Sequence, residues 1–164
     1  MDEPFQADLL VIERLVYARW GGQPAGCAEV DRVLNRVARR QGWTFVGVPG
    51  LDSCASYRAH KWGDRYGEVI GWTLLTLNIA AVSSQRPAWG LPPEFHLLST
   101  GPLHDALSAD GSLVLPDASW LLAPLSDDDR AALRASEAGS GWEAYNLKHW
   151  KPSTRAEALF THWD

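Results

Sequence analysis

Residues 52–66 concentrate side chains that could do chemistry. Cys54 is a potential nucleophile, His60 a potential base and Asp64 a potential orienting carboxylate. If a helix began at Ser53, Cys54 would lie in its first turn, where the helix dipole stabilises a thiolate. His60 and Asp64 would then share a helical face, because they are four residues apart. The pattern allows a small enzyme, a hydrolase or transferase, with Cys54, His60 and Asp64 as catalytic residues.

The same segment also carries side chains typical of binding surfaces. Cys54 and His60 are six residues apart and would lie well apart around a helix, so a Cys-His pair needs a bend or a second histidine from elsewhere. An alternative is a surface for a ligand or a partner protein. Its candidate residues are Tyr57, Arg58, Lys61, Trp62 and Arg65. A third interpretation is a solvated connection held by ordinary salt bridges.

Four arginines recur along one face of the helix that is predicted over residues 27–41. This arginine row consists of Arg32, Arg36, Arg39 and Arg40, at spacings i, i+4, i+7 and i+8. An anionic partner or nucleic acid could bind there. Glu29 and Asp31 are close enough for some pairing, and positive charge is favourable near a helix C-terminus. The row therefore also fits a solvated helix face.

Metal and cofactor motifs are missing from the sequence. The cysteines show no C-x-x-C spacing, and the histidines show neither H-x-x-x-H nor H-x-E. Glycine-rich nucleotide loops and the G-x-S-x-G elbow are also missing. We therefore expect no metal and no cofactor.

Composition bears on the class of partner. The net charge of -5 argues against a nucleic acid and favours another protein. The nine tryptophans could include a stacking platform, but they are scattered along the chain. Packing in the core or at its rim explains them better.

The chain has the features of a cytoplasmic protein. It begins with the acidic letters MDEP, which do not resemble a secretion signal. Its longest apolar stretch, Val69 to Val82, is shorter than the about 20 residues that span a bilayer, so we expect no membrane association. Two cysteines, Cys27 and Cys54, fit reduced thiols in a cytosol.

Several segments show helical signals. Apolar residues at helical spacing predict amphipathic helices over residues 5–20 and 27–41. Ser126 precedes three aspartates and predicts the cap of a helix that continues to about residue 138. Thr154 with Glu157 predicts a capping box for a last helix.

The remaining segments are harder to assign. Residues 68–83 are apolar on every face, which fits a central buried helix or two buried strands, and the length favours a helix. Residues 44–48 fit a short strand or an extended arm. Residues 95–98 and 112–115 are candidate strands that pair into a small sheet.

These elements predict one globular domain over residues 1–164. Its expected class is α+β leaning to mostly α, with about five helices around a buried central helix and a small antiparallel sheet. An all-α bundle is the alternative.

The functional prediction is a non-catalytic protein-binding domain, such as a bacterial immunity protein, an antitoxin-like protein or a regulatory partner. Small size, acidity and abundant aromatic residues support it. It predicts an exposed patch that contains Trp or Tyr. The small enzyme described above is the alternative, and nucleic-acid binding through the arginine row is a weaker third option.

Overall fold

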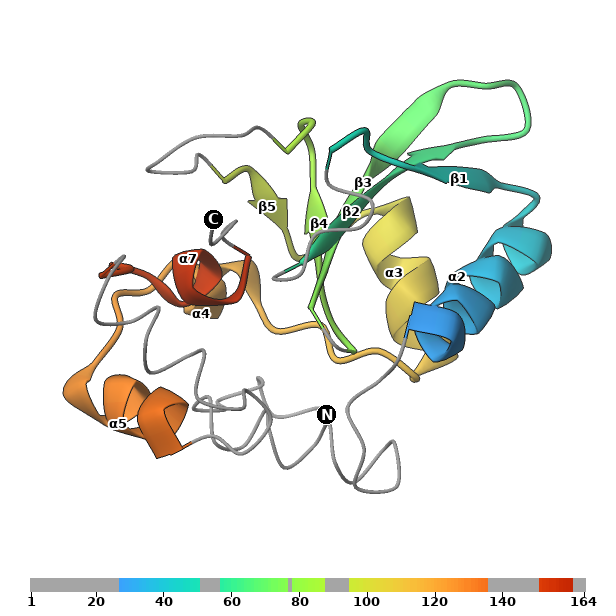
Figure 1. The fold of residues 1–164 in the computed structure, drawn as a ribbon. Helices are drawn as coiled ribbons and strands as arrows, with labels where there is room; N and C mark the ends of the chain where they lie inside the picture. Colours follow the sequence, from blue (N-terminus) through green and yellow to red (C-terminus); the bar gives the residue numbers. More distant parts are fainter. Residues whose placement is uncertain (1–26, 51–56, 77, 88–94, 136–150, 161–164) are drawn as a thin grey trace.

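Five strands and five short helices make up the part of the chain that the structure describes (Figure 1). A computed structural model describes residues 27–50, 57–76, 78–87, 95–135 and 151–160. The strands are β1 (Thr44–Gly47), β2 (Arg58–Gly63), β3 (Val69–Thr76), β4 (Ile79–Ser83) and β5 (Leu97–Leu98). The helices are α2 (Cys27–Gln41), α3 (Pro102–Asp110), α4 (Ala118–Leu121), α5 (Asp127–Ala135) and α7 (Arg155–Leu159).

The strands form one antiparallel sheet. Their order is β1-β2-β3-β4-β5, so β1 and β5 are its edges. The pairing of β2 with β3 is irregular next to Gly63, which lies opposite Val69, whereas Trp62 lies opposite Gly71. A Cβ at Gly71, where φ is +153°, would come within 3.1 Å of the Leu103 side chain. Glycine therefore lets α3 approach the sheet closely.

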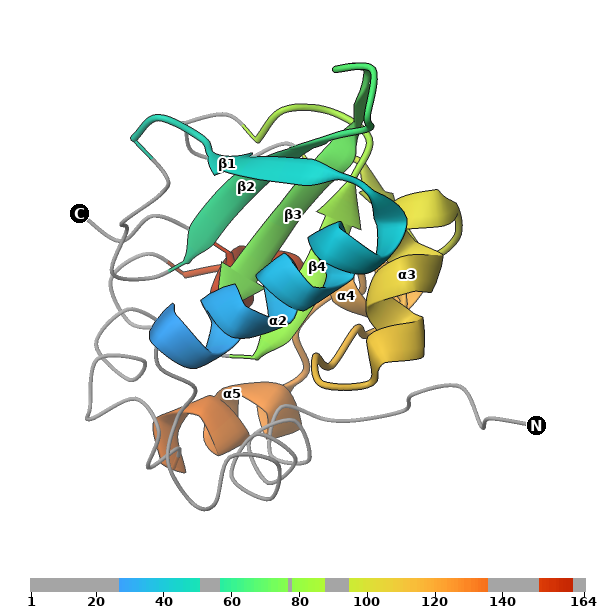
Figure 2. The same cartoon turned by 90° about the vertical axis from the view of Figure 1, so that its right-hand side faces the viewer.

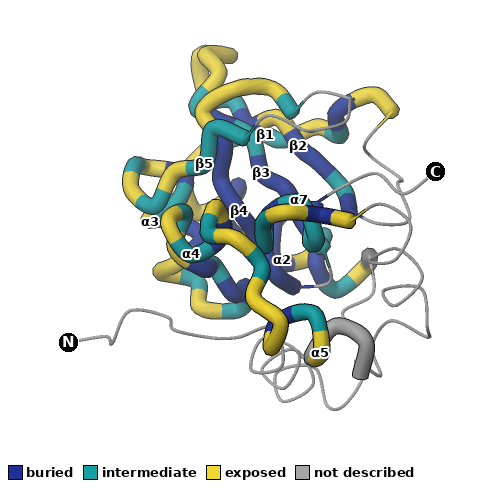
Figure 3. The backbone as a smooth tube through the Cα atoms, turned by 90° about the vertical axis from the view of Figure 1, so that its left-hand side faces the viewer, coloured by how far each residue is buried: buried dark blue, intermediate teal, exposed yellow. Residues whose placement is uncertain are grey.

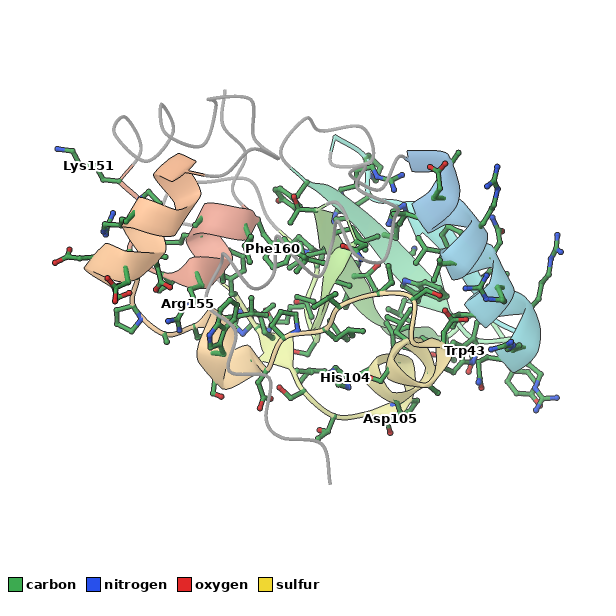
Figure 4. The ribbon with its side chains drawn as sticks, turned by 90° about the horizontal axis from the view of Figure 1, so that it is seen from below. Trp43, His104, Asp105, Lys151, Arg155 and Phe160 are labelled. Atoms are coloured by element: carbon green, nitrogen blue, oxygen red, sulfur yellow. The ribbon has the colours of Figure 1, made fainter. Side chains whose placement is uncertain are left out.

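Helices cover both faces of the sheet (Figures 1 and 2). Because side chains alternate along a strand, Leu75 faces α2 and α3, while its neighbour Leu74 lies in the cluster that includes Phe160. Figure 4 shows Phe160 pointing toward the sheet, whereas Lys151 points outward. The two apolar clusters are thus separated by the sheet itself.

The expected fold class is wrong, and residues 68–83 are the reason. This segment is not a central buried helix: it forms β3 and β4, and Thr76 pairs with Ile79 in the antiparallel sheet. The sheet, rather than a helix, is therefore the centre of the fold, which is neither mostly α nor all-α. The length of the apolar run favoured a helix in the sequence analysis. In the structure, the chain reverses at Asn78, which divides the run into two pieces of strand length.

Other local predictions are confirmed. The helix over residues 27–41 and the strand at residues 44–48 are present as α2 and β1. Ser126 caps α5, since its Oγ accepts from Asp129 N at 3.0 Å and its N–H donates to Asp129 Oδ2 at 3.0 Å. Thr154 caps α7, accepting from the backbone N–H of Glu157 at 3.1 Å.

The predicted small sheet differs from the observed pairing. β5, within residues 95–98, pairs with β4 and not with residues 112–115. Val114 instead makes an isolated parallel bridge to Ile79. The predicted helix over residues 5–20 lies outside the described residues. None of the described helices is long and apolar enough to cross a membrane.

Candidate protein-binding surface

The segment richest in reactive side chains forms a strand and the start of a turn where the structure describes it. β2 begins at Arg58, so the conditional helix from Ser53 is wrong over residues 58–63. Cys54 lies outside the described residues, and its role as a nucleophile stays a prediction. His60 is buried on β2, with its ring edge-on to Phe45 at a centroid distance of 5.6 Å.

Asp64 serves the turn that follows β2. Its Oδ1 accepts hydrogen bonds from the backbone N–H of Tyr66 at 2.8 Å and of Glu68 at 3.0 Å. A shared helical face with His60 does not exist, because residues four apart in extended chain lie roughly 13 Å apart. The structure therefore gives Asp64 a clear structural role.

Three of the predicted binding residues of this segment are held inside the fold. Trp62 is fully buried, and its Nε1 donates to Thr73 Oγ1 at 3.1 Å. Tyr57 is buried in the cluster beneath α7. Arg58 is half-buried and pairs with Asp31 at 3.1 Å.

The other two, Lys61 and Arg65, are exposed, and the next residue, Tyr66, is the most exposed large apolar side chain of the described residues, at 78%. Arg65 Cζ lies 5.4 Å from the centroid of the Tyr66 ring. The residue list drawn from the sequence did not include Tyr66. The letters GDRYG have a β-prone run on each side, which is a signal for a hairpin. This signal could have identified Tyr66 as a turn residue.

Four hydrogen bonds fix the turn that presents Tyr66. Besides the two that Asp64 Oδ1 accepts, Asp64 N donates to Glu68 O at 2.9 Å, and Gly67 N donates to Asp64 O at 3.0 Å. Gly67 has φ +82°, a left-handed conformation that glycine adopts without strain. The backbone beneath Arg65 and Tyr66 is thus held in one shape.

Exposed apolar side chains continue from this turn onto the neighbouring strands. Val69 on β3 is 48% exposed and Val46 on β1 is 56% exposed. Val46 lies directly opposite Lys61 in the sheet. We define the hairpin patch as Val46, Lys61, Arg65, Tyr66 and Val69. The turn projects beyond the helices in Figures 2 and 3, and Figure 3 colours it as exposed.

The arginine row is divided between an internal tie and open solvent. Arg36 binds the Asp110 carboxylate through two bonds, from Nε at 2.7 Å and from Nη2 at 2.8 Å, and its Nη2 also donates to Ser112 Oγ at 2.9 Å. Arg40 lies 3.6 Å from the same carboxylate. Arg32 and Arg39 are exposed and have no ion pair with any described residue.

This tie fixes the charge of the groups that make it. The hydrogen bond from Arg36 is the main reason that the pKa of Asp110 falls to about 2, from an ordinary value of 3.8. The pKa of Arg36 is raised by the same hydrogen bond. Half of the arginine row thus holds α2 to the end of α3.

Among the described residues, no three His, Cys, Asp or Glu side chains come together as a metal site. Comparisons of the chain with protein-family models, with curated proteins and with solved structures find no match. The candidate site therefore depends on the geometry alone: Val46 lies opposite Lys61 in the sheet, and the fixed turn after β2 presents Arg65 and Tyr66.

Proposed function

We propose that the chain is a non-catalytic protein-binding domain, acting in the cytoplasm as an immunity protein, an antitoxin-like protein or a regulatory partner, and that the hairpin patch is its binding surface. The observation that carries the proposal is Tyr66, 78% exposed on a turn whose backbone is fixed by Asp64. Tyrosine and arginine are enriched among residues that dominate binding energy. A fixed turn also lowers the entropy that is lost when they are buried.

The hairpin patch has the composition of an interface core with a charged rim. Tyr66, Val69 and Val46 supply apolar area, while Lys61 and Arg65 supply charge beside it. The Arg65 guanidinium lies near the Tyr66 ring, so a partner that binds here contacts both side chains together. The arginine row supports nucleic-acid binding less well, because Arg36 and Arg40 share Asp110.

Site-specific photo-crosslinking in the native cell tests the proposal. A benzoylphenylalanine at position 66 should crosslink one protein, whereas the same group at Leu122 should not. Leu122 is the matched control because it is 43% exposed and lies at the end of α4, on another part of the fold.

The captured protein is then purified for affinity measurements. Tyr66→Ala should weaken its binding by about tenfold or more, as for an interface hot spot, and Leu122→Ala should leave it unchanged. A partner that binds Tyr66→Ala as tightly as the parent chain, or no crosslink at position 66, would show that the proposal is wrong.

A further inference from the structure

The edge strand next to the hairpin patch has backbone groups that no strand of the described residues pairs with. Val48 N donates to Ala59 O at 2.9 Å, and the register of β1 with β2 makes Val46 and Lys61 the next hydrogen-bonded pair. Antiparallel pairing alternates, so the N–H and C=O groups of Phe45 and Gly47 point away from β2. They face the open edge of the sheet, since no strand of the described chain lies beyond β1 (Figure 2).

The residues of β1 itself do not protect the edge against pairing with another chain. Natural edge strands are often blunted by lysine or proline, and β1 contains neither over its letters TFVG. Val46 presents its side chain beside the edge and is 56% exposed. An added strand would bury Val46 and continue the row of side chains that runs from Lys61 to Val46.

The charge around β1 is opposite to that of the whole chain. Within described residues 27–50 and 57–76, seven Lys and Arg stand against four Asp and Glu, and positive charge still exceeds negative when Asp110, the partner of Arg36 and Arg40, is added, although the net charge of the chain is -5. Lys61, Arg65 and Arg39 are exposed and have no ion pair with any described residue. An acidic occupant is therefore complementary to this surface, and a second copy would bring like charges together.

We propose that β1 is a docking edge for an extended, acidic segment of a partner protein, which adds a strand beside Phe45 and Gly47. The inference rests on the proposed function and specifies how the partner binds. Main-chain hydrogen bonds hold the added strand, and its alternate side chains contact Val46 on one face of the sheet. Acidic side chains of the same segment meet Lys61 and Arg39.

A library of random linear peptides displayed on phage is the probe. Selection on the wild-type chain should enrich peptides that alternate apolar residues and carry net negative charge. Gly47→Pro removes the outward N–H without touching the ladder to β2, and Gly47→Ala keeps that N–H. The selected peptides should bind Gly47→Pro about tenfold more weakly than Gly47→Ala, because a paired main-chain group is lost and proline crowds the edge.

Hydrogen exchange on the wild-type chain gives a second readout, which decides the matter if Gly47→Pro does not fold. Binding of a selected peptide should slow exchange at the amides of Phe45 and Gly47, which point outward, and change little at Val46, which already bonds to β2. No enriched peptide, cationic peptides, or equal binding to both variants without this protection would overturn the inference. Self-association lost in Gly47→Pro would make a second copy the occupant and would also overturn it.

The two proposals fail in different ways. A partner that crosslinks at position 66 and binds Gly47→Pro as tightly as Gly47→Ala contradicts only the docking edge. A chain that selects acidic peptides at β1, but has no crosslink at position 66, contradicts the hairpin patch as the binding surface.

Discussion

The arginine row on α2 and the hairpin between β2 and β3 both carry basic residues that the sequence predicts to lie at the surface. The two groups of residues have different partners in the fold. In the row, Arg36 is held by an Asp110 carboxylate that is 2% exposed and 74 residues away along the chain. On the hairpin, Arg65 has a tyrosine beside it, and its charge is not matched by any described carboxylate.

The difference teaches that a basic pattern alone does not mark a binding surface. What decides is whether the fold brings a buried carboxylate to the arginine. A bidentate pair with such a carboxylate is a structural tie, because breaking it leaves a charge without a partner. An arginine on a fixed turn next to an exposed aromatic ring keeps its binding capacity for another molecule.

The largest expected effect separates two aromatic residues of the same hairpin. Trp62→Ala should lower the free energy of unfolding by about 3–5 kcal/mol, because Trp62 is fully buried and its removal leaves a cavity. Tyr66→Ala should change it by no more than about 0.5 kcal/mol, since Tyr66 is 78% exposed. Urea unfolding followed by circular dichroism measures both. Similar losses in the two variants would contradict the assignment of one residue to the core and the other to the surface.

The next effect is the acid sensitivity of the tie between α2 and α3. The pKa of Asp110 is lowered to about 2 in the folded chain, so its stabilisation is present above the ordinary value of 3.8 and is lost as pH falls toward 2. Asp110→Asn should lower the free energy of unfolding by about 2 kcal/mol at pH 6. The difference from the parent chain should shrink between pH 4 and pH 2.

Asp105→Asn is the control for this prediction, because Asp105 lies on the same helix and its side chain is 74% exposed. Its effect should stay within about 0.5 kcal/mol at each pH. If Asp110→Asn lowers the free energy of unfolding by the same amount at pH 6 and at pH 2.5, the stabilisation does not come from the ionised carboxylate.

Local signals were enough to predict part of the fold. The buried stripe and terminal glycine of α2, the cap at Ser126 and the cap at Thr154 depend on neighbours within a few residues. The sheet could not be predicted in the same way. An apolar run over residues 68–83 has the same pattern in a buried helix and in two buried strands, and only the pairing of Thr76 with Ile79 distinguishes them.

The candidate site was predictable in outline and not in detail. Residues 52–66 were singled out from the sequence as a region to inspect, and Lys61 and Arg65 are exposed there. Assigning Trp62 to the inside required the alternation of a strand, which a helical interpretation hides. The tie between Arg36 and Asp110 depends on α3 packing against α2, and no local pattern contains that information.

A smaller effect tests how the hairpin presents its side chains. Asp64→Ala removes two hydrogen bonds to backbone N–H groups and should lower the free energy of unfolding by about 1 kcal/mol. Asp64→Asn is the matched control, since its side-chain oxygen can accept the same bonds. The captured partner should bind Asp64→Ala more weakly than Asp64→Asn. Equal affinities would mean that the fixed turn does not contribute to binding.

An effect of similar size completes the comparison within the arginine row itself. Arg36→Ala should lower the free energy of unfolding by about 1 kcal/mol, because it leaves the Asp110 carboxylate with a weaker partner in Arg40 at 3.6 Å. Arg39→Ala should change it by less than about 0.5 kcal/mol, since Arg39 is exposed and has no ion pair with a described residue. Thermal unfolding at low and at high salt measures the stability of both variants. Added salt should reduce the difference in stability between Arg36→Ala and Arg39→Ala only modestly. The reason is that the Asp110 side chain is 2% exposed, so its ion pair is screened less than a surface pair.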